Sequence, residues 1–445
     1  MLYSNLSRKL LCNQIPFILH QDKVLGRKAM GKKIVVSVRS AKDVKKVKDL
    51  LESHNSLNRH RKIERTSSGF NLFTNLRSDD GLINIDVEHC IGTYEDDSSQ
   101  PLRANSSPDP IEVITSILKG MNVCNIDELI ATAPKKWSIY PPMVLFPPNS
   151  FDTEAWNKLF RTGGASNTFF EALIREIPAF SRVTHVAVNK PIIEHDIMRR
   201  PLHLVPLYGD FGPEPTQEMY DSPSETDFAR AFWCTAVQNG IFQTWAPRYT
   251  MFSRGNVKEK KRLLDTYRNL HDTFVYDFYA GIGYFTLSYL KNGATVFCWE
   301  INPWSIQGLV KSVSQNGYKY KLFTPGCTLD KAALDRYRRD GVSVFIFHES
   351  NEKATERNAA VASLPISHIN MGLLPSSRPS WQQAQEVAST SSWRSILHVH
   401  ENVHISEFDG LSRSLSSYYN GEILHLEKVK TFAPDIWHVV LDVSL

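Results

Sequence analysis

A glycine turn between two apolar, strand-like runs constrains the fold of this chain more than any other feature. The segment Asp277-Phe-Tyr-Ala-Gly-Ile-Gly-Tyr-Phe285 begins in the first run, and Gly281 and Gly283 allow a ligand close to the backbone. A helical segment and a second run, Thr295–Glu300, follow. Glu300 lies nineteen residues after Gly281, the spacing at which a carboxylate ends the second strand and accepts hydrogen bonds from ribose hydroxyls. The pattern predicts a nucleoside site in a Rossmann-like α/β domain.

The residues around the turn favour one class of nucleoside cofactor. Thr286 occupies the position of the third glycine in a dinucleotide fingerprint, which disfavours NAD. Asp277 before the first glycine and the pair Tyr284-Phe285 after the second resemble motif I of class I S-adenosylmethionine-dependent transferases. The alternatives are an NAD-type or nucleotide-free α/β domain and a chance glycine turn. Glu300 argues against a chance turn, because an acid at a strand end has little structural purpose.

The composition is that of a globular protein. The 445 residues suffice for two or three domains, and the net charge of +4 restricts any nucleic-acid surface to a local patch. The six cysteines form no CxxC pair, so we expect reduced thiols, a cytoplasmic location and no zinc ribbon. No run of about 18 apolar residues occurs, so we expect no transmembrane helix.

Changes in composition divide the chain into three expected domains. Residues 1–143 form an N-terminal α/β domain with a flexible loop at 95–110. Residues 144–255 form a middle α/β domain with a hairpin turn at Asn239-Gly240, where both positions need positive φ. Residues 256–445 form the Rossmann-like domain. The basic residues 1–29 suit a mitochondrial transit peptide, a poorly ordered tail, or translation that starts at Met30.

The sequence of the third domain contains helix-capping residues and a last pair of strands that we expect to be antiparallel. Asn256 and Glu259 predict a capping box at the start of one helix, and Asn302-Pro303 opens another. Strands and helices then alternate up to Glu422–Lys430 and Trp437–Val443, which we expect to pair antiparallel. This order predicts the sheet of a class I S-adenosylmethionine-dependent transferase, with an antiparallel last strand.

Further motifs accompany the glycine turn. They are Met251-Phe-Ser-Arg-Gly-Asn-Val-Lys-Glu-Lys260, Trp299-Glu-Ile-Asn-Pro303, Asn370-Met-Gly-Leu-Leu-Pro-Ser-Ser377, His398-Val-His-Glu-Asn402 and Trp437-His-Val-Val-Leu-Asp442. Together they resemble the tRNA wybutosine-synthesizing protein 2 family, strongly over residues 183–445. The resemblance implies transfer of the 3-amino-3-carboxypropyl group of S-adenosylmethionine to 4-demethylwyosine at position 37 of tRNA(Phe). This step of wybutosine biosynthesis releases methylthioadenosine.

Two other activities stay open. The nearest relatives in fold are tRNA (guanine-37-N1) methyltransferases, which carry an Asn-Leu-Pro-Pro-like motif where this chain has Gly372-Leu-Leu-Pro-Ser-Ser377. Gly372 has no side chain to place near a base, which favours aminocarboxypropyl transfer. A catalytically silent RNA-binding scaffold is the third alternative. The intact set of Asp277, Gly281, Gly283 and Glu300 argues against it, because a scaffold has no reason to retain these residues.

The resemblance also implies the site residues. Arg254 is a candidate for the methionine carboxylate, because a guanidinium binds a carboxylate bidentately, and a solvated surface charge is the alternative. Relatives have Gly-Asp-Asn near the adenine where this chain has His348-Glu-Ser-Asn351, so Glu349 or Asn351 is expected there. The expected catalytic residues are Arg254 and His398. The expected cofactor-binding residues are Ser253, Arg254, Asp277, Tyr279, Ala280, Gly281, Gly283, Glu300, Ile301, Asn302, Glu349 and Asn351.

Several histidines have a functional and a structural interpretation. His398 and His400 lie at period two on an expected strand, so they face the same side. A place near the substrate pocket and packing in the core are both open. No third ligand follows at standard spacing, so we expect no metal. His185 also resembles a family pattern, with a local hydrogen bond as the alternative.

Basic clusters are the expected contacts to the anticodon region of tRNA(Phe). The main cluster is Arg248, Lys258, Lys260, Lys261 and Arg262, and further candidates are Arg199-Arg200 and Lys135-Lys136-Trp137. Such residues supply salt-dependent affinity without sequence readout, and a solvated helix face is the alternative. We expect the N-terminal domain to take part in tRNA recognition and the chain to be a monomer without a membrane partner.

Overall fold

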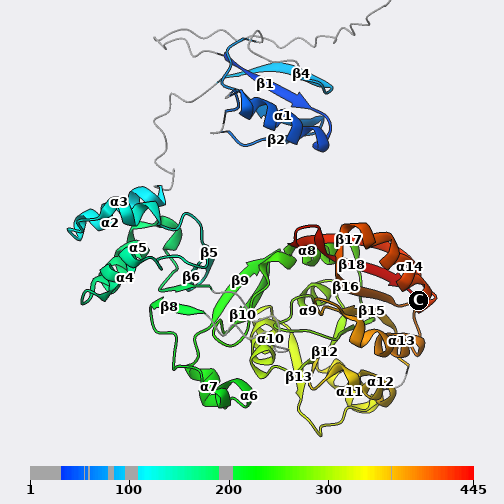
Figure 1. Ribbon diagram of the computed structural model, residues 1–445. Helices are drawn as coiled ribbons and strands as arrows, with labels where there is room; N and C mark the ends of the chain where they lie inside the picture. The colour runs from blue at the N-terminus through cyan, green and yellow to red at the C-terminus, as the bar shows by residue number, and fades with distance from the viewer. Residues whose placement is uncertain are drawn as a thin grey trace, which may run out of the picture. The chain divides into compact units, whose positions relative to one another are not determined.

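The computed structural model describes residues 32–54, 56–58, 61–78, 85–95, 109–189, 204–361 and 363–445. The chain consists of two compact units, Met1–Ser106 and Ser107–Leu445 (Figure 1). The expectations for residues 1–29 and for the pair Arg199-Arg200 lie outside the described residues. No helix among the described residues is long and apolar enough to cross a membrane.

The first unit contains a small antiparallel sheet covered by one helix. Its strand order is β2-β3-β1-β4, and the helix is α1. The side chains of Val47 and Leu51 pack α1 against the sheet, and Ser40 caps the helix by accepting a hydrogen bond from the Lys42 amide at 3.2 Å. The bounds are β1 (Lys32–Val38), α1 (Ala41–Ser53), β2 (Glu64–Thr66), β3 (Gly69–Phe73) and β4 (His89–Glu95).

The second unit begins with four helices against a four-stranded sheet of order β5-β6-β7-β8. An aromatic cluster that includes Phe151, Trp156, Phe169 and Phe170 fills the space between them. β5 pairs with β6 across the expected domain boundary at residue 143, so that boundary divides one sheet. The bounds are α2 (Pro110–Gly120), α3 (Ile126–Ala131), β5 (Ser138–Tyr140), β6 (Met143–Phe146), α4 (Glu154–Arg161), α5 (Ala165–Glu176), β7 (His185–Val188) and β8 (Val205–Tyr208).

A β-hairpin connects this sheet to the rest of the unit. β9 (Cys234–Gln238) and β10 (Ile241–Trp245) pair antiparallel around Asn239 and Gly240, which have φ of 55° and 70°. The predicted hairpin is therefore confirmed. Two short helices, α6 (Gln217–Asp221) and α7 (Glu225–Arg230), precede it.

An eight-stranded sheet forms the centre of the second unit, with strand order β13-β14-β12-β11-β15-β16-β18-β17. The first six strands in this order are parallel, and β18 runs antiparallel between β16 and β17. The predicted fold class and its antiparallel last strand are confirmed, whereas β13 was not predicted. The bounds are β11 (Phe274–Asp277), β12 (Thr295–Glu300), β13 (Lys319–Phe323), β14 (Val342–His348), β15 (Ile366–Met371), β16 (Ile396–His404), β17 (Glu422–Ala433) and β18 (Ile436–Ser444).

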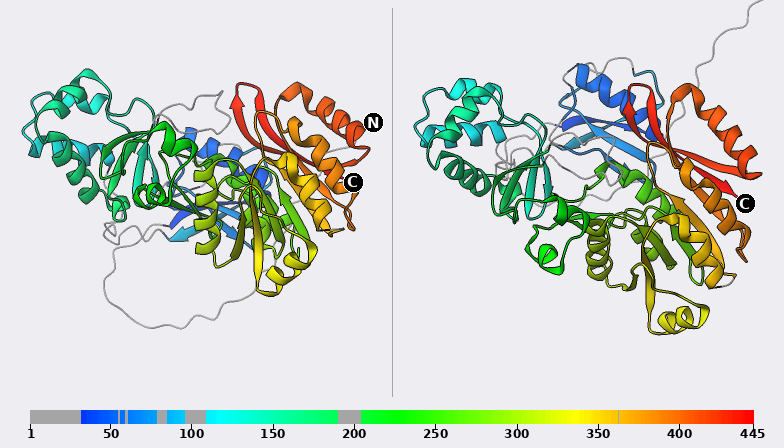
Figure 2. Two further views of the ribbon diagram at one scale, coloured as in Figure 1. Left: turned by 90° about the horizontal axis from the view of Figure 1, so that it is seen from below. Right: turned by 60° about the horizontal axis from the view of Figure 1, so that its bottom comes forward.

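Helices cover both faces of this sheet, as parallel strands require (Figure 2). On one face, α8, α9 and α10 pack on residues such as Val275 and Val296. On the other, α11 to α14 pack on Tyr276, Phe297 and Trp299. The bounds are α8 (Val257–Thr266), α9 (Thr286–Lys291), α10 (Pro303–Gln315), α11 (Lys331–Arg339), α12 (Ala354–Ala360), α13 (Trp381–Ser389) and α14 (Phe408–Tyr419).

The start of α8 differs from the expected capping box. Asn256 is the N-cap residue, but its side chain makes no capping hydrogen bond. The carboxylate of Glu259 is buried and pairs with Arg262 at 2.7 Å instead of turning back to the N-cap. The capping-box prediction is wrong because this acid serves an internal ion pair.

Asp442 on β18 is the centre of that buried ion-pair network. Its carboxylate accepts hydrogen bonds from Arg262 at 2.5 and 2.9 Å, from His398 Nδ1 at 2.7 Å and from the Tyr267 hydroxyl. Burial alone would raise the pKa of Asp442, but His398 and Arg262 hold it well below its usual range. The network therefore ties α8 to the sheet with an ionised carboxylate at neutral pH.

We predict that Asp442→Asn lowers the free energy of unfolding by about 3 kcal/mol at pH 7, because the buried Arg262 and His398 lose their shared carboxylate and Arg262 keeps only Glu259 as an acidic partner. Since the pKa of Asp442 is depressed in the folded state, the wild-type advantage is present at neutral pH. It shrinks as the pH falls below about 4. Guanidinium denaturation at pH 7 and pH 3.5 measures both effects.

The control is Asp265→Asn, which removes an exposed carboxylate that pairs with Lys261 on the same helix. We expect little change in stability there, because exposed ion pairs contribute little. Equal losses in the two variants would contradict the structural role of the Asp442 network.

Candidate active site

The glycine turn lies at the carboxyl end of β11, where the order in which strands are added to the sheet reverses. β12 and β15 flank β11, and ligands in open α/β sheets bind outside the strand ends at such a switch point. Gly281 has φ of 55°, and a Cβ there would lie 2.8 Å from the Tyr284 ring. Gly283 has φ of 87°, and a Cβ there would lie 2.8 Å from Leu309 of α10. The absence of a side chain lets the Tyr284 ring pack over Gly281 and lets Leu309 of α10 pack against Gly283.

Glu300 ends β12 directly beside the turn. Its Oε2 accepts a hydrogen bond from the Gly281 amide at 2.8 Å, and its Oε1 accepts from the amides of Ile301 and Asn302 at 2.9 and 2.8 Å. Burial raises the pKa of Glu300, and the three amides act in the opposite direction. The carboxylate is thus held in one orientation and retains lone pairs for a further donor.

Asp277 does not face a ligand. Its side chain is fully buried, and its carboxylate accepts from Thr286 at 2.7 and 3.1 Å and from Asn370 Nδ2 at 3.0 Å. The expected cofactor contact of this side chain is therefore corrected, because protein donors surround it. Asp277 shapes the turn by joining β11 to the start of α9 and to β15.

Of the remaining residues expected to bind the cofactor, two form hydrogen bonds within the protein and four lie beside the turn and Glu300. Glu349 is largely buried and forms a bidentate ion pair with Arg357 at 2.8 and 2.7 Å, which fixes its carboxylate, and its adenine contact stays a prediction. Asn351 donates from Nδ2 to the Phe278 carbonyl at 2.9 Å. The residues that stay next to the turn and Glu300 are Tyr279, Ala280, Ile301 and Asn302.

The turn fits the nucleoside part of S-adenosylmethionine. Asn302 is almost fully buried, and its Oδ1 caps α10 by accepting from the Trp304 amide at 2.9 Å. Its Nδ2 has no hydrogen-bond partner among the described residues, and neither does Asn370 Oδ1. The fixed Glu300 carboxylate and the unpaired, buried amide nitrogen of Asn302 together suit a polar ligand.

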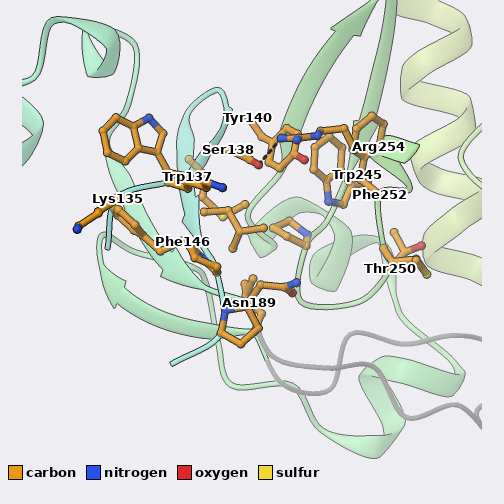
Figure 3. A pocket seen from close by; sticks show the side chains of 18 residues that line it. Lys135, Trp137, Ser138, Tyr140, Phe146, Asn189, Trp245, Thr250, Phe252 and Arg254 are labelled. Carbon is orange, nitrogen blue, oxygen red and sulfur yellow. Dashed lines mark hydrogen bonds between the residues drawn. The ribbon is translucent and has the colours of Figure 1, made fainter. Parts of the chain in front are cut away.

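A pocket of about 710 Å³ opens beside the segment that precedes α8 (Figure 3). The rings of Trp245 and Phe252 stack with centroids 4.5 Å apart, and Tyr140 meets both edge-on. Lys135 and Arg254 also line the pocket. Sequence reasoning missed this aromatic wall, because its rings come from β5, β10 and a loop, and no sequence spacing links them.

Arg254 lines this pocket, and Ser253 precedes it in the chain. The Arg254 Nη1 donates to Ser138 Oγ of β5 at 2.6 Å, which directs the guanidinium along the pocket wall (Figure 3). Lys430 Nζ contacts Ser253 Oγ at 3.5 Å. The structure therefore brings Arg254 together with the separately predicted cluster Lys135-Lys136-Trp137.

Tyr284 is one contact between the pocket and the glycine turn. Tyr284 covers Gly281, and its hydroxyl donates to the carbonyl of Met251, which lines the pocket. Its ring also lies 6.4 Å from that of Phe252 between centroids. Tyr284 therefore packs between the glycine turn and the wall of the pocket.

Three of the five expected RNA-binding residues are buried rather than exposed. Arg248 pairs with Glu214 at 2.5 Å and donates to two backbone carbonyls. Arg262 belongs to the Asp442 network, and Lys260 is 3% exposed. These expectations are corrected because the charged groups point into the protein. Lys258 and Lys261 are exposed, with side chains 57% and 62% accessible.

The histidines are structural in character. His398 is fully buried, with its ring nitrogens bonded to Asp442 at 2.7 Å and His368 at 3.0 Å, so its expected catalytic role is corrected. His400 is also buried and packs near Phe285. His185 donates from Nε2 to the Asp210 carbonyl at 3.0 Å. Among the described residues, no cluster of three His, Cys, Asp or Glu side chains has the arrangement of a metal site.

Known proteins match this chain over most of its length. A family model described as the TRM5/TYW2 methyltransferase domain matches residues 236–324. The tRNA wybutosine-synthesizing protein 2 of Schizosaccharomyces pombe is 42% identical over 322 residues, which is 70% of this chain and 72% of that protein.

The protein of the same name from Saccharomyces cerevisiae is 35% identical over 388 residues, covering 75% of this chain and 80% of that protein. A crystal structure of P. horikoshii TYW2 in complex with MeSAdo covers 75% of this chain and 98% of that chain at 21% identity, with a TM-score of 0.47. The fungal matches confirm the resemblance seen in the motifs, and the chain belongs to the tRNA wybutosine-synthesizing protein 2 family.

Proposed function

We propose that the chain transfers the 3-amino-3-carboxypropyl group of S-adenosylmethionine to 4-demethylwyosine at position 37 of tRNA(Phe), with release of methylthioadenosine. The observation that carries this function is the fixed Glu300 carboxylate beside Gly281, in a turn that Tyr284 joins to the wall of an aromatic pocket. Family membership supplies the reaction.

When bound, S-adenosylmethionine supplies a sulfonium with three adjacent carbons that a nucleophile can attack. In this proposal Glu300, held beside the Gly281 amide, accepts hydrogen bonds from the ribose hydroxyls. The chain's contribution is placement, because holding two reactants in contact geometry lowers the barrier without an acid–base pair.

The aromatic pocket suits a flat, enlarged base. Its volume of about 710 Å³ is that of a typical small-ligand site. Trp245, Phe252 and Tyr140 provide apolar ring surface, and unstacked RNA bases commonly stack on aromatic side chains. The tricyclic guanosine derivative therefore occupies this pocket in our proposal.

Arg254 is the candidate residue for group choice, which means the selection of the group of S-adenosylmethionine that is transferred. Its guanidinium lies at the pocket wall, held by Ser138, and presents further donors in a planar fork. A methionine carboxylate bound there directs the aminocarboxypropyl carbon, rather than the methyl group, toward the pocket.

The end of β15 disfavours the methyltransferase alternative. Gly372 follows this strand, and a Cβ at Gly372 would lie 3.2 Å from Asn370 Nδ2 and 3.2 Å from the Phe285 ring. A side chain at position 372 would require Asn370 or Phe285 to shift. Gly372 therefore offers no side-chain amide to a target base.

The RNA surface in this proposal uses the exposed lysines Lys135, Lys136, Lys258 and Lys261. Lys135 and Lys136 line the pocket itself, where phosphates flanking an inserted base would pass. We also propose that the chain acts in the cytoplasm, since the cysteines in its described part are free thiols.

The test of the function uses tRNA(Phe) from a strain that lacks this step and cofactor labelled separately in the methyl and carboxyl carbons. We expect carboxyl label in the RNA. Methyl label alone would instead identify a methyltransferase, and no label would leave only an RNA-binding scaffold.

Glu300→Ala tests the cofactor site. We expect S-adenosylmethionine affinity to fall about tenfold or more in calorimetry, because charge-assisted hydrogen bonds contribute roughly 1.5–3 kcal/mol. Affinity for tRNA should survive. The matched control is Glu422→Ala, which removes an exposed carboxylate on β17. Unchanged cofactor affinity in the Glu300 variant would exclude the assigned role.

Arg254→Ala tests group choice. We expect aminocarboxypropyl transfer to fall far more than affinity for methylthioadenosine, which lacks the carboxylate. Arg254→Lys keeps the charge but loses the planar fork, so its transfer rate should be intermediate. Equal losses of transfer and of methylthioadenosine affinity would mean that Arg254 supports the fold or the RNA instead.

A further inference from the structure

Lys260 is a buried amine without an acidic partner. It lies on α8 with 3% of its surface exposed, and among the described residues no carboxylate pairs with it. Its Nζ donates to Gln243 Oε1 at 2.5 Å and to Gln238 Oε1 at 3.0 Å. Burial lowers the pKa of Lys260 to about 7. An apolar side chain of similar length would avoid this unfavourable burial, so stability does not explain the residue.

The hydrogen bond from Lys260 to Gln243 connects the lysine to the glycine turn. Gln243 is almost fully buried, and its Nε2 donates to the Gly283 carbonyl at 2.9 Å. The ammonium form of Lys260 can only donate and the Gly283 carbonyl can only accept, so together they require the amide oxygen of Gln243 to face Lys260. The amide nitrogen is then directed at the turn. Lys260 thereby fixes the orientation of the group that holds Gly283.

A second contact leads to the aromatic pocket. The Nζ of Lys260 lies 5.0 Å from the ring centroid of Phe252 and 5.3 Å from that of Tyr284. Phe252 is part of the pocket wall, and Tyr284 covers Gly281. A cation at this distance from an aromatic face is attracted to it, the more so when it is shielded from water.

We infer that Lys260 is a positioning residue that locks the cofactor turn to the wall of the base pocket. The inference rests on the proposed function, because it assigns the turn to S-adenosylmethionine and the pocket to the RNA base. Lys260 touches neither ligand. It acts through Gln243 on Gly283 and through ring contacts on Phe252 and Tyr284, so one side chain sets the relative position of two binding places.

The experiment compares Lys260→Met, Gln243→Leu and the double variant with the wild type in the full chain. The dissociation constant of S-adenosylmethionine is measured by calorimetry, and the KM for tRNA(Phe) is measured by carboxyl-label transfer. Lys331→Met is the matched control, because it removes an exposed lysine that pairs with Asp335 on α11.

We expect Lys260→Met to raise both constants by about fivefold or more, the size of one lost hydrogen bond. Gln243→Leu should raise the dissociation constant similarly but affect KM less, since the contact between Lys260 and Phe252 remains. The double variant should bind the cofactor no more weakly than Gln243→Leu alone. The control should match the wild type.

A merely structural lysine would lower the melting temperature and leave both constants unchanged, which would overturn the inference. Additive losses of cofactor affinity in the double variant would overturn it as well. If Lys260→Met does not fold, an unchanged dissociation constant in Gln243→Leu is decisive against it. Calorimetry requires no transfer to RNA, so failure of the labelled-transfer test and failure of this inference are separate results.

Discussion

The buried carboxylate of Asp277 is the interaction on which the rest of the site depends. It joins the end of β11 to the amide and hydroxyl of Thr286 and to Asn370 on β15. These bonds fix the turn between them, since both ends of the turn are tied to one side chain. Thr286 stands where a dinucleotide fold has a third glycine, so a hydrogen bond here replaces close helix–strand packing. The position of Glu300 relative to Gly281 follows from that fixed turn.

Sequence patterns predicted those parts of the fold that depend on neighbouring residues. The glycine turn, the Asn239-Gly240 hairpin and the antiparallel strand at the end of the sheet are confirmed. Their signals are local, because positive φ at Gly281 or Asn239 is decided within a few residues. β13 was missed because Lys319–Phe323 is short and half polar, as an edge strand can be.

The roles of charged residues on α8 were not predictable from the helix alone. Lys258, Lys260, Lys261 and Arg262 form one basic run, yet two of them are exposed and two are buried. The difference arises from partners that are distant in sequence. Asp442 lies 180 residues from Arg262, and no spacing rule connects them. The same distant carboxylate explains why His398 is a core residue.

The aromatic pocket and the glycine turn belong to different sheets, and their relative position matters for which group is transferred in the proposed function. The base pocket takes Tyr140 from the smaller sheet and Trp245 from the hairpin, whereas the cofactor turn belongs to the larger sheet. Two binding places on different sheets keep a constant separation only if the contact between them is rigid. Tyr284 makes that contact with a partly buried ring, and Lys260 makes it through the buried amide of Gln243. Because a shift of about 1 Å in a reacting centre can change a rate by a factor of about 100, the proposed function makes this junction the element that sets which carbon meets the base.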